Sequence, residues 1–156
     1  MTLLIESAMK ITEALLAEHV VFHNLFDHIE RTLPRLKTLP EIRSLAGLLE
    51  SLLETHSLAE DRLIIEPLEH CLEQLGQHET FHQEHIEIEE NVKRAQTTRD
   101  LRKSRKHLLA AVLASRKHFD KEERIVFPMA EKLLKGKTLT ALGKSWIQHR
   151  NAAIVV

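Results

Sequence analysis

Residues His118–Pro128 read HFDKEERIVFP, in which a His and a Glu stand four residues apart, ahead of an apolar run that ends at proline. A similar stretch, His56–Pro67, has the sequence HSLAEDRLIIEP. Residues four apart lie on the same face of a helix, one turn from each other. Each stretch therefore presents an imidazole and a carboxylate toward a common point, which suggests two helices converging on a metal site.

Apolar stripes at helical spacing predict that these two stretches lie on two of four long helices. The first helix is expected from about residue 4 to 33, and its stripe is Leu15, His19, Phe22, Phe26, Ile29 and Leu33. The second begins near Glu41, with the stripe Ile42, Leu45, Leu49, Leu52, His56, Glu60 and Leu63. The third covers about 77–97, with Phe81, His85, Ile88, Val92 and Ala95 facing inward. The fourth runs to about Leu134, with the stripe Leu101, Leu108, Val112, Ser115, His118, Glu122, Ile125 and Met129.

Proline and glycine mark the expected joints between these helices. Pro34 and Pro40 bracket the first connection, and Gly76 and Gly136 are expected helix stops. Asp100 or the preceding threonines are expected to cap the fourth helix. The sequence therefore predicts an all-α fold, an up-down-up-down four-helix bundle with a short extra C-terminal helix at about 138–150. Residues 1–156 are expected to form a single domain whose core spans about 5–135.

The composition of the chain argues against some classes of function. The formal net charge is −1, with one Trp and no Tyr, so neither a basic surface nor a stacking platform favours nucleic acid. The apolar runs are too short to span a membrane. Cys71 is the one cysteine, which favours a reducing compartment and a cytoplasmic location. The apolar tail AAIVV is expected to pack on the chain or against a partner, as in a homodimer.

Six polar residues stand at stripe positions where apolar residues are expected: His19, His56, Glu60, His85, His118 and Glu122. Two buried carboxylates that face each other are costly unless a cation lies between them. Two Glu residues and neutral imidazoles fit two divalent ions better than one, and the remaining positive charge favours a bridging hydroxide. Nitrogen and carboxylate ligands without thiolate favour iron, manganese or zinc.

Three other histidines are weaker candidates for this site. His78 and His82 lie on the helix of His85, and His82 competes with it as a ligand. His23 follows His19 by one helical turn and is expected to stand behind the ligands rather than among them.

These residues resemble the hemerythrin-like family of His-His-Glu (HHE) cation-binding domains, over about residues 10–130. In that family one His on the first helix, His-x-x-x-Glu on the second, one His on the third and His-x-x-x-Glu on the fourth hold a non-haem di-iron centre. The resemblance implies an oxo- or hydroxo-bridged pair of iron ions held by the six residues, with manganese or zinc as other metals. It also implies a small diatomic or peroxide ligand, namely dioxygen, nitric oxide or peroxide, bound for sensing, storage or scavenging.

The sequence departs from the oxygen-carrying hemerythrins at the fourth helix. Those proteins have His-x-x-x-x-Asp there, whereas Glu122 stands at the fourth place after His118. Two alternatives therefore stay open. One is a redox enzyme, or an iron donor for the repair of iron–sulfur sites, at the same centre. The other is a closed bundle that stores metal or serves a structural role.

Overall fold

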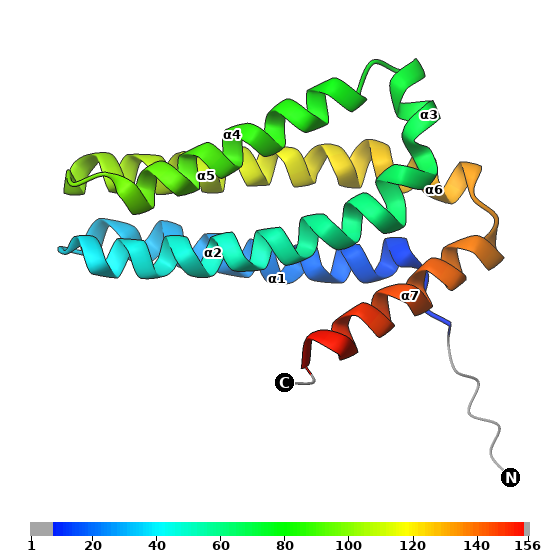
Figure 1. Ribbon diagram of the computed structural model, residues 1–156, viewed down its shortest axis with the longest axis horizontal. Helices are drawn as coiled ribbons and strands as arrows, with labels where there is room; N and C mark the ends of the chain where they lie inside the picture. The colour runs from blue at the N-terminus through cyan, green and yellow to red at the C-terminus, as the bar shows by residue number, and fades with distance from the viewer. Residues whose placement is uncertain (1–7, 155–156) are drawn as a thin grey trace, which may run out of the picture.

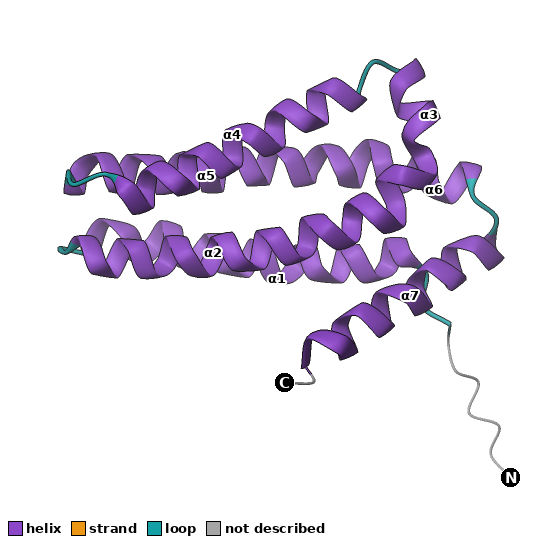
Figure 2. Cartoon of the chain, in the orientation of Figure 1, coloured by secondary structure: helices purple, strands orange, loops and turns teal. Residues whose placement is uncertain are grey.

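The computed structural model describes the backbone of residues 8–154, and in this part of the chain every regular element is a helix (Figures 1 and 2). The helices are α1 (Ile11–Thr32), α2 (Leu39–Glu60), α3 (Glu66–Gln74), α4 (His78–Thr97), α5 (Leu101–Lys121), α6 (Phe127–Leu133) and α7 (Gly136–Ile154). A 3-10 turn at Leu33–Arg35 follows α1, and π-helical turns at Asp61–Ile65 and Glu122–Val126 join α2 to α3 and α5 to α6. The predicted all-helical fold is confirmed, and the packing is that of a helical bundle.

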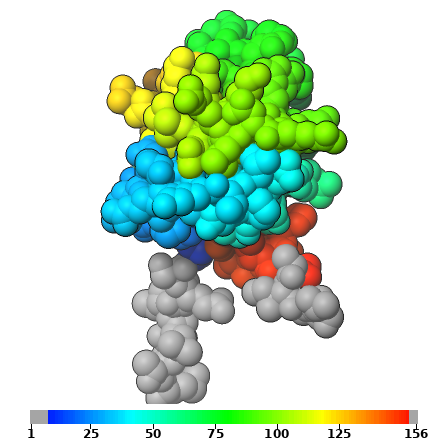
Figure 3. Space-filling view, turned by 90° about the vertical axis from the view of Figure 1, so that its left-hand side faces the viewer, coloured from blue at the N-terminus to red at the C-terminus, as the bar shows by residue number. Residues whose placement is uncertain are grey.

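The arrangement in space follows from the contacts between helices. The helix α5 packs along α4 and against α1 and α2, while α2 also contacts α4. Seen end-on, the α1–α2 part of the chain lies against the α4–α5 part (Figure 3). The helix α7 lies outside these four, against α1 (Figure 1). None of the helices within residues 8–154 combines the length and hydrophobicity of a membrane span.

Two hydrophobic clusters fill the bundle, one on each side of its middle. The first includes Phe26, Ile29 and Leu49. The second includes Leu15 and Leu63. Five of the six polar stripe residues are buried within the bundle: His19, His56, Glu60, His118 and Glu122. The sixth, His85, is half-buried.

Several helix ends follow the predicted signals. The Asp100 side chain accepts a hydrogen bond from Lys103 N–H at 2.9 Å and so caps α5, as expected. Gly76 ends the α3 segment with a φ of 66°, which suits glycine because it has no Cβ. Pro40 lies in the first turn of α2 rather than in the connection, where its missing N–H costs nothing.

Other boundaries differ from the prediction. The helix α1 begins at Ile11, and the predicted start near residue 4 lies outside the described residues. Gly136 begins α7 instead of closing the preceding helix, and α7 is longer than the predicted 138–150. The predicted packing of the AAIVV tail also lies outside the side chains that the structure describes.

Two predicted core positions are wrong. Leu52 is 40% exposed, because the buried face of α2 runs instead through Ala46, Leu49 and His56. Ile125 is 36% exposed, and Val126 is buried in its place. The π-helical turn explains this second shift, since its extra residue per turn moves every later side chain around the helix axis.

Candidate metal centre

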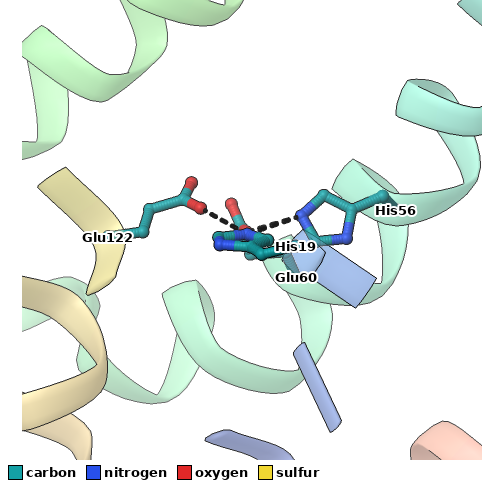
Figure 4. Close-up of side chains that lie close together, drawn as sticks. All are labelled: His19, His56, Glu60 and Glu122. Carbon is teal, nitrogen blue, oxygen red and sulfur yellow. Dashed lines mark hydrogen bonds and ion pairs between the residues drawn. The ribbon is translucent and has the colours of Figure 1, made fainter. Parts of the chain in front are cut away.

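The structure brings the six polar stripe residues together in the middle of the bundle. Their donor atoms form two groups, and within each group all the atoms lie within 4.8 Å of one another. The first group is His19, His56, Glu60 and Glu122, which Figure 4 shows. The second group is Glu60, His85, His118 and Glu122. Both carboxylates, Glu60 and Glu122, belong to both groups.

The contacts between imidazoles and carboxylates have the spacing of ligands around a shared ion. Glu122 Oε2 lies 3.1 Å from His19 Nε2, and Glu122 Oε1 lies 2.5 Å from His118 Nε2. Glu60 Oε2 lies 3.1 Å from His56 Nε2. Two donors that are each about 2.1 Å from one ion, at about 90° to each other, are about 3.0 Å apart. The observed distances therefore leave room for an ion between the donors.

Despite these short distances, three carboxylate oxygens in the centre make no hydrogen bond. They are Glu60 Oε2 and both oxygens of Glu122, and all three are buried. Ring nitrogens of His19, His56 and His118 lie 2.5–3.1 Å from these oxygens, yet the contacts do not meet the geometry of hydrogen bonds. Buried carboxylate oxygens without partners are unstable by several kcal/mol. A cation in that space removes the penalty, so the donor set fits a metal.

The pKa values of Glu122, His56 and His85 are all shifted by their surroundings in the centre. Burial, with the charge of Glu60 added to it, raises the pKa of Glu122 well above its usual value. Burial also lowers the pKa of His56, but the hydrogen bond with Glu18 and the nearby carboxylate of Glu60 outweigh it and raise that pKa to about 10. Burial and the neighbouring His118 lower the pKa of His85. The raised pKa values of Glu122 and His56 indicate that this space favours positive charge, which protons or cations can supply, while the lowered pKa of His85 favours its neutral form, with a lone pair available to a cation.

The imidazoles also pair with each other through the nitrogens that face the centre. His19 Nε2 and His56 Nε2 are 3.3 Å apart, and His85 Nε2 and His118 Nε2 are 2.7 Å apart. Each pair takes one imidazole from each of two neighbouring helices. The structure thus repeats the same His–His arrangement in the two halves of the chain.

A second layer of carboxylates holds the outer nitrogens of three imidazoles. His56 Nδ1 lies 2.6 Å from Glu18 Oε2, and His118 Nδ1 lies 2.8 Å from Glu84 Oε2. His19 Nδ1 lies 2.9 Å from Glu123 Oε1. An Nδ1–H that donates to a carboxylate leaves the Nε2 lone pair free and aimed inward, which is the arrangement that metal-bound histidines use. The sequence analysis did not identify these three glutamates.

Two carboxylates of the second layer, Glu18 and Glu84, occupy matching places in the two halves of the chain. Glu18 and Glu84 each precede a histidine of the centre, yet each pairs with the histidine of the next long helix, His56 or His118. The repeated Glu-His dipeptide was the one signal of these residues in the sequence. The counterpart of Glu123 is Asp61, whose pKa is raised by burial and by the charges of Glu60 and Glu66. Among the described residues, no side-chain hydrogen bond joins Asp61 to His85, so His85 is held less firmly than the other three histidines.

The helix α7 reaches the centre through Glu18. Trp146 Nε1–H donates to Glu18 Oε1 at 2.6 Å, and Arg150 Nε donates to the same oxygen at 2.7 Å. The other oxygen of Glu18 holds His56. Trp146 also packs against the second hydrophobic cluster.

The π-helical turns place two consecutive carboxylates on one imidazole. Glu122 approaches His19 Nε2, and Glu123 approaches His19 Nδ1 at 2.9 Å. In the wide turn the Phe127 N–H donates to Glu122 O, five residues back. The turn at Asp61–Ile65 is built in the same way directly after Glu60. Both turns precede a proline at the second residue of the next helix, Pro67 or Pro128, which has no N–H to donate.

Aromatic rings fix the orientation of the imidazoles. Phe119 stacks on His19, with ring centroids 3.9 Å apart and an interplanar angle of 2°. Phe22 meets His56 edge-on at 5.2 Å, and Phe81 meets His118 edge-on at 5.4 Å.

A cavity of about 410 Å³ connects the centre with the surface between α2 and α4. His56, Glu60, His85 and His118 line its inner end. Leu53, Ile88, Val92 and Phe119 form apolar parts of its walls, and the exposed side chains of Glu54, Glu89 and Lys93 also line it. We call this space the apolar cavity; it gives an uncharged guest a route to the metal ligands.

The three weaker candidates lie outside both groups of donor atoms. His23 Nε2 lies 3.5 Å from Glu123 Oε1, behind the carboxylate that holds His19, which is where the sequence analysis expected it. His78 and His82 line a separate cavity on the α3 side of the centre. His85, rather than His82, is the α4 histidine whose donor atom joins the groups.

Replacing Glu18 by Gln is expected to weaken metal binding by about 10- to 100-fold, because the amide no longer fixes the tautomer of His56. Isothermal titration with zinc measures the affinity. Glu13→Gln removes a carboxylate from the exposed start of the same helix and serves as the control. Equal affinities of the Glu18 variant and the control would show that the second layer does not act on the metal.

Three comparisons place this geometry among known proteins. The model of one protein family, the hemerythrin HHE cation binding domain, matches residues 10–130. Neither the curated proteins nor the solved structures gave a match. The matched segment contains all six residues of the two donor groups.

Proposed function

The chain belongs to the hemerythrin HHE cation-binding domain family, and from this premise we propose that it is a non-haem di-iron protein that binds dioxygen or a related small ligand. The observation that carries the proposal is the pair of buried carboxylates, Glu60 and Glu122, whose unpaired oxygens face four imidazoles. In this proposal α1, α2, α4 and α5 form an up-down-up-down four-helix bundle around the two ions. Manganese and zinc also fit these nitrogen and oxygen donors, so the proposal keeps them as alternatives to iron.

Each ion is assigned two imidazoles and shares both carboxylates. His19 and His56 would hold one ion, and His85 and His118 would hold the other, with Glu60 and Glu122 between them. Two iron ions would supply redox chemistry and open coordination positions. Glu18, Glu84 and Glu123 keep the imidazoles oriented.

The apolar cavity supports a small uncharged guest. Leu53, Ile88, Val92 and Phe119 give it apolar wall surface, and its inner end is formed by His85 and His118 on one side and His56 on the other. Dioxygen, nitric oxide and hydrogen peroxide are small enough to cross it. Sensing, storage and scavenging all fit such a guest. The proposal keeps a cytoplasmic location, which rests on the single Cys71.

Iron donation is a second candidate function, and it has a structural observation of its own. His85 is half-buried, and no carboxylate holds its outer nitrogen among the described residues. The ion at His85 and His118 is therefore the one that a protein built to release iron would give up first.

An optical experiment tests the function. Iron-loaded protein prepared without oxygen is exposed to azide and, separately, to cycles of oxygen and argon. A binding protein is expected to gain visible absorption that reverses when the guest is removed. An unchanged spectrum with azide would favour a closed centre, and consumption of peroxide or nitric oxide over many cycles would favour an enzyme.

Two variants test whether the small guest reaches the centre through the apolar cavity. Leu53→Trp fills part of the apolar cavity and is expected to slow the azide-induced change several-fold. Leu52→Trp adds the same ring to the neighbouring residue, which is 40% exposed and does not line the cavity. Equal rates in the two variants would contradict a route through the cavity.

A further inference from the structure

A second cavity, of about 240 Å³, opens on the side of the centre where α3 and α4 meet. Its outer part is lined by acids and imidazoles: Asp61, Glu66, Glu69, His78 and His82. We call these five residues the vestibule. The vestibule uses the two histidines of α4 that do not join the donor groups of the centre.

The side chains that line this cavity become less exposed to solvent from its mouth toward the centre. At its mouth the side chains of Glu69 and His78 are 55% and 43% exposed, with Glu69 Oε1 and His78 Nε2 3.7 Å apart. Asp61 and His85 are half-buried further in. Glu60, at the inner end, is 1% exposed.

The inner end of the cavity carries an unpaired donor. Glu60 lines both cavities, and its buried Oε2 has no hydrogen-bond partner. His85 also lines both. An ion that crosses the vestibule therefore meets a metal-binding carboxylate and imidazole without crossing the hydrophobic core.

The density of ligand-type side chains distinguishes the two cavities. On the vestibule side, carboxylates and imidazoles make up seven of the nine lining residues, and no Lys or Arg is among the described residues there. The apolar cavity also has four carboxylates and three imidazoles, but they are spread over 15 lining residues together with Lys93 and the apolar side chains of Leu53, Ile88 and Val92. A cleft lined by charges of one sign concentrates counter-ions and raises their rate of binding by about 10- to 1,000-fold.

We propose that the vestibule is the entry site for divalent cations, which bind transiently to its carboxylates and imidazoles and pass through Glu60 and His85 into the centre. The guest molecule then has its own path through the apolar cavity. This inference rests on the proposed metal centre and adds to it a route for loading and, in reverse, for release. It also gives His78 and His82 a role as transient ligands.

Uptake of cobalt(II) by metal-free protein, followed by its visible absorption in a stopped-flow instrument, tests the route. A Glu66→Gln/Glu69→Gln variant is expected to take up cobalt about tenfold more slowly than wild type, with the same final amount bound. Higher ionic strength is expected to narrow the difference, because salt screens exposed charges.

Glu54→Gln/Glu89→Gln is the matched control, since it removes two carboxylates from the lining of the apolar cavity and changes the net charge equally. This control is expected to load like wild type. A vestibule variant that loads at the wild-type rate, or a control that is slowed equally, would overturn the inference while leaving the metal centre in place. Wild-type protein that binds no cobalt at equilibrium would overturn the proposed function as well.

A second variant tests the histidines. His78→Gln/His82→Gln is expected to slow uptake and to leave the final amount of cobalt unchanged. A loss of bound cobalt would make these residues ligands of the centre and would overturn their assignment to the vestibule.

Discussion

Glu122→Ala is expected to bind at most about one metal ion per chain, where the wild-type protein is expected to bind about two. Glu122 belongs to both donor groups, and its two oxygens approach His19 and His118 separately. Its loss therefore takes a ligand from each ion and leaves Glu60 as the remaining shared carboxylate. Metal analysis of purified, iron-loaded protein measures the effect, and full retention of metal would contradict the assignment.

Asp120→Asn is the matched control for Glu122→Ala. Asp120 lies on α5, two residues before Glu122, and forms a surface ion pair with Arg124 at 3.0 Å. Its removal changes the charge of the same helix and not the centre. The control is expected to keep the wild-type metal content.

The same site predicts an effect on stability that depends on metal. Glu122→Gln keeps the shape of the side chain and removes its charge. Metal at 100 times its dissociation constant stabilises the folded wild-type protein by about 2.7 kcal/mol, and the variant is expected to lose most of that gain. Without metal, the free energy of unfolding of the variant is expected to match or exceed that of wild type, because a buried carboxylate without partners is destabilising. Thermal unfolding with and without metal measures both quantities.

Phe119→Ala is expected to lower the free energy of unfolding by about 3–5 kcal/mol. The ring is 2% exposed, stacks on His19 and meets Phe22 edge-on at 5.3 Å. A loss of this size is a large share of the about 5–15 kcal/mol that stabilises a typical domain. It would also free the His19 ring from its stacking partner, so metal affinity is expected to fall with stability.

Urea unfolding of the metal-free protein measures the Phe119 effect apart from metal. Leu113→Ala, on the exposed face of the same helix at 54% exposure, is expected to change the free energy of unfolding by less than about 0.5 kcal/mol. A change in Phe119→Ala that is no larger than in this control would mean that the ring does not support the centre.

The stripes could predict the inward residues because burial repeats with the helical period. His19, His56 and His118 interrupt apolar stripes, and the structure buries each of them. The capping aspartate of α5 and the glycine after α3 followed from local chemistry in the same way. Such features depend on residues within one or two turns of one another.

The π-helical turns could not be predicted from periodicity. No residue type favours this turn, and its extra residue moved the buried position from Ile125 to Val126. The prolines at 67 and 128 were visible, yet proline at a helix boundary fits several backbone geometries.

The second layer depends on packing between distant parts of the chain. Glu18 looks like a residue of a solvated helix face, but Trp146 and Arg150, which hold it, are 128 and 132 residues away. Glu84 and Glu123 likewise contact histidines of other helices that are distant in the sequence. Charged residues next to a buried histidine are common on helices, so only the fold distinguishes these three from exposed glutamates.

The central claim is that the six residues hold two cations, and metal analysis of the wild-type protein tests it most directly. The protein is loaded with iron(II) without oxygen, freed of excess metal by gel filtration, and its iron and protein contents are measured together. The structure predicts about two ions per chain. A value near zero after loading would contradict the metal centre, and a value of about one would contradict the bridging role of Glu60 and Glu122.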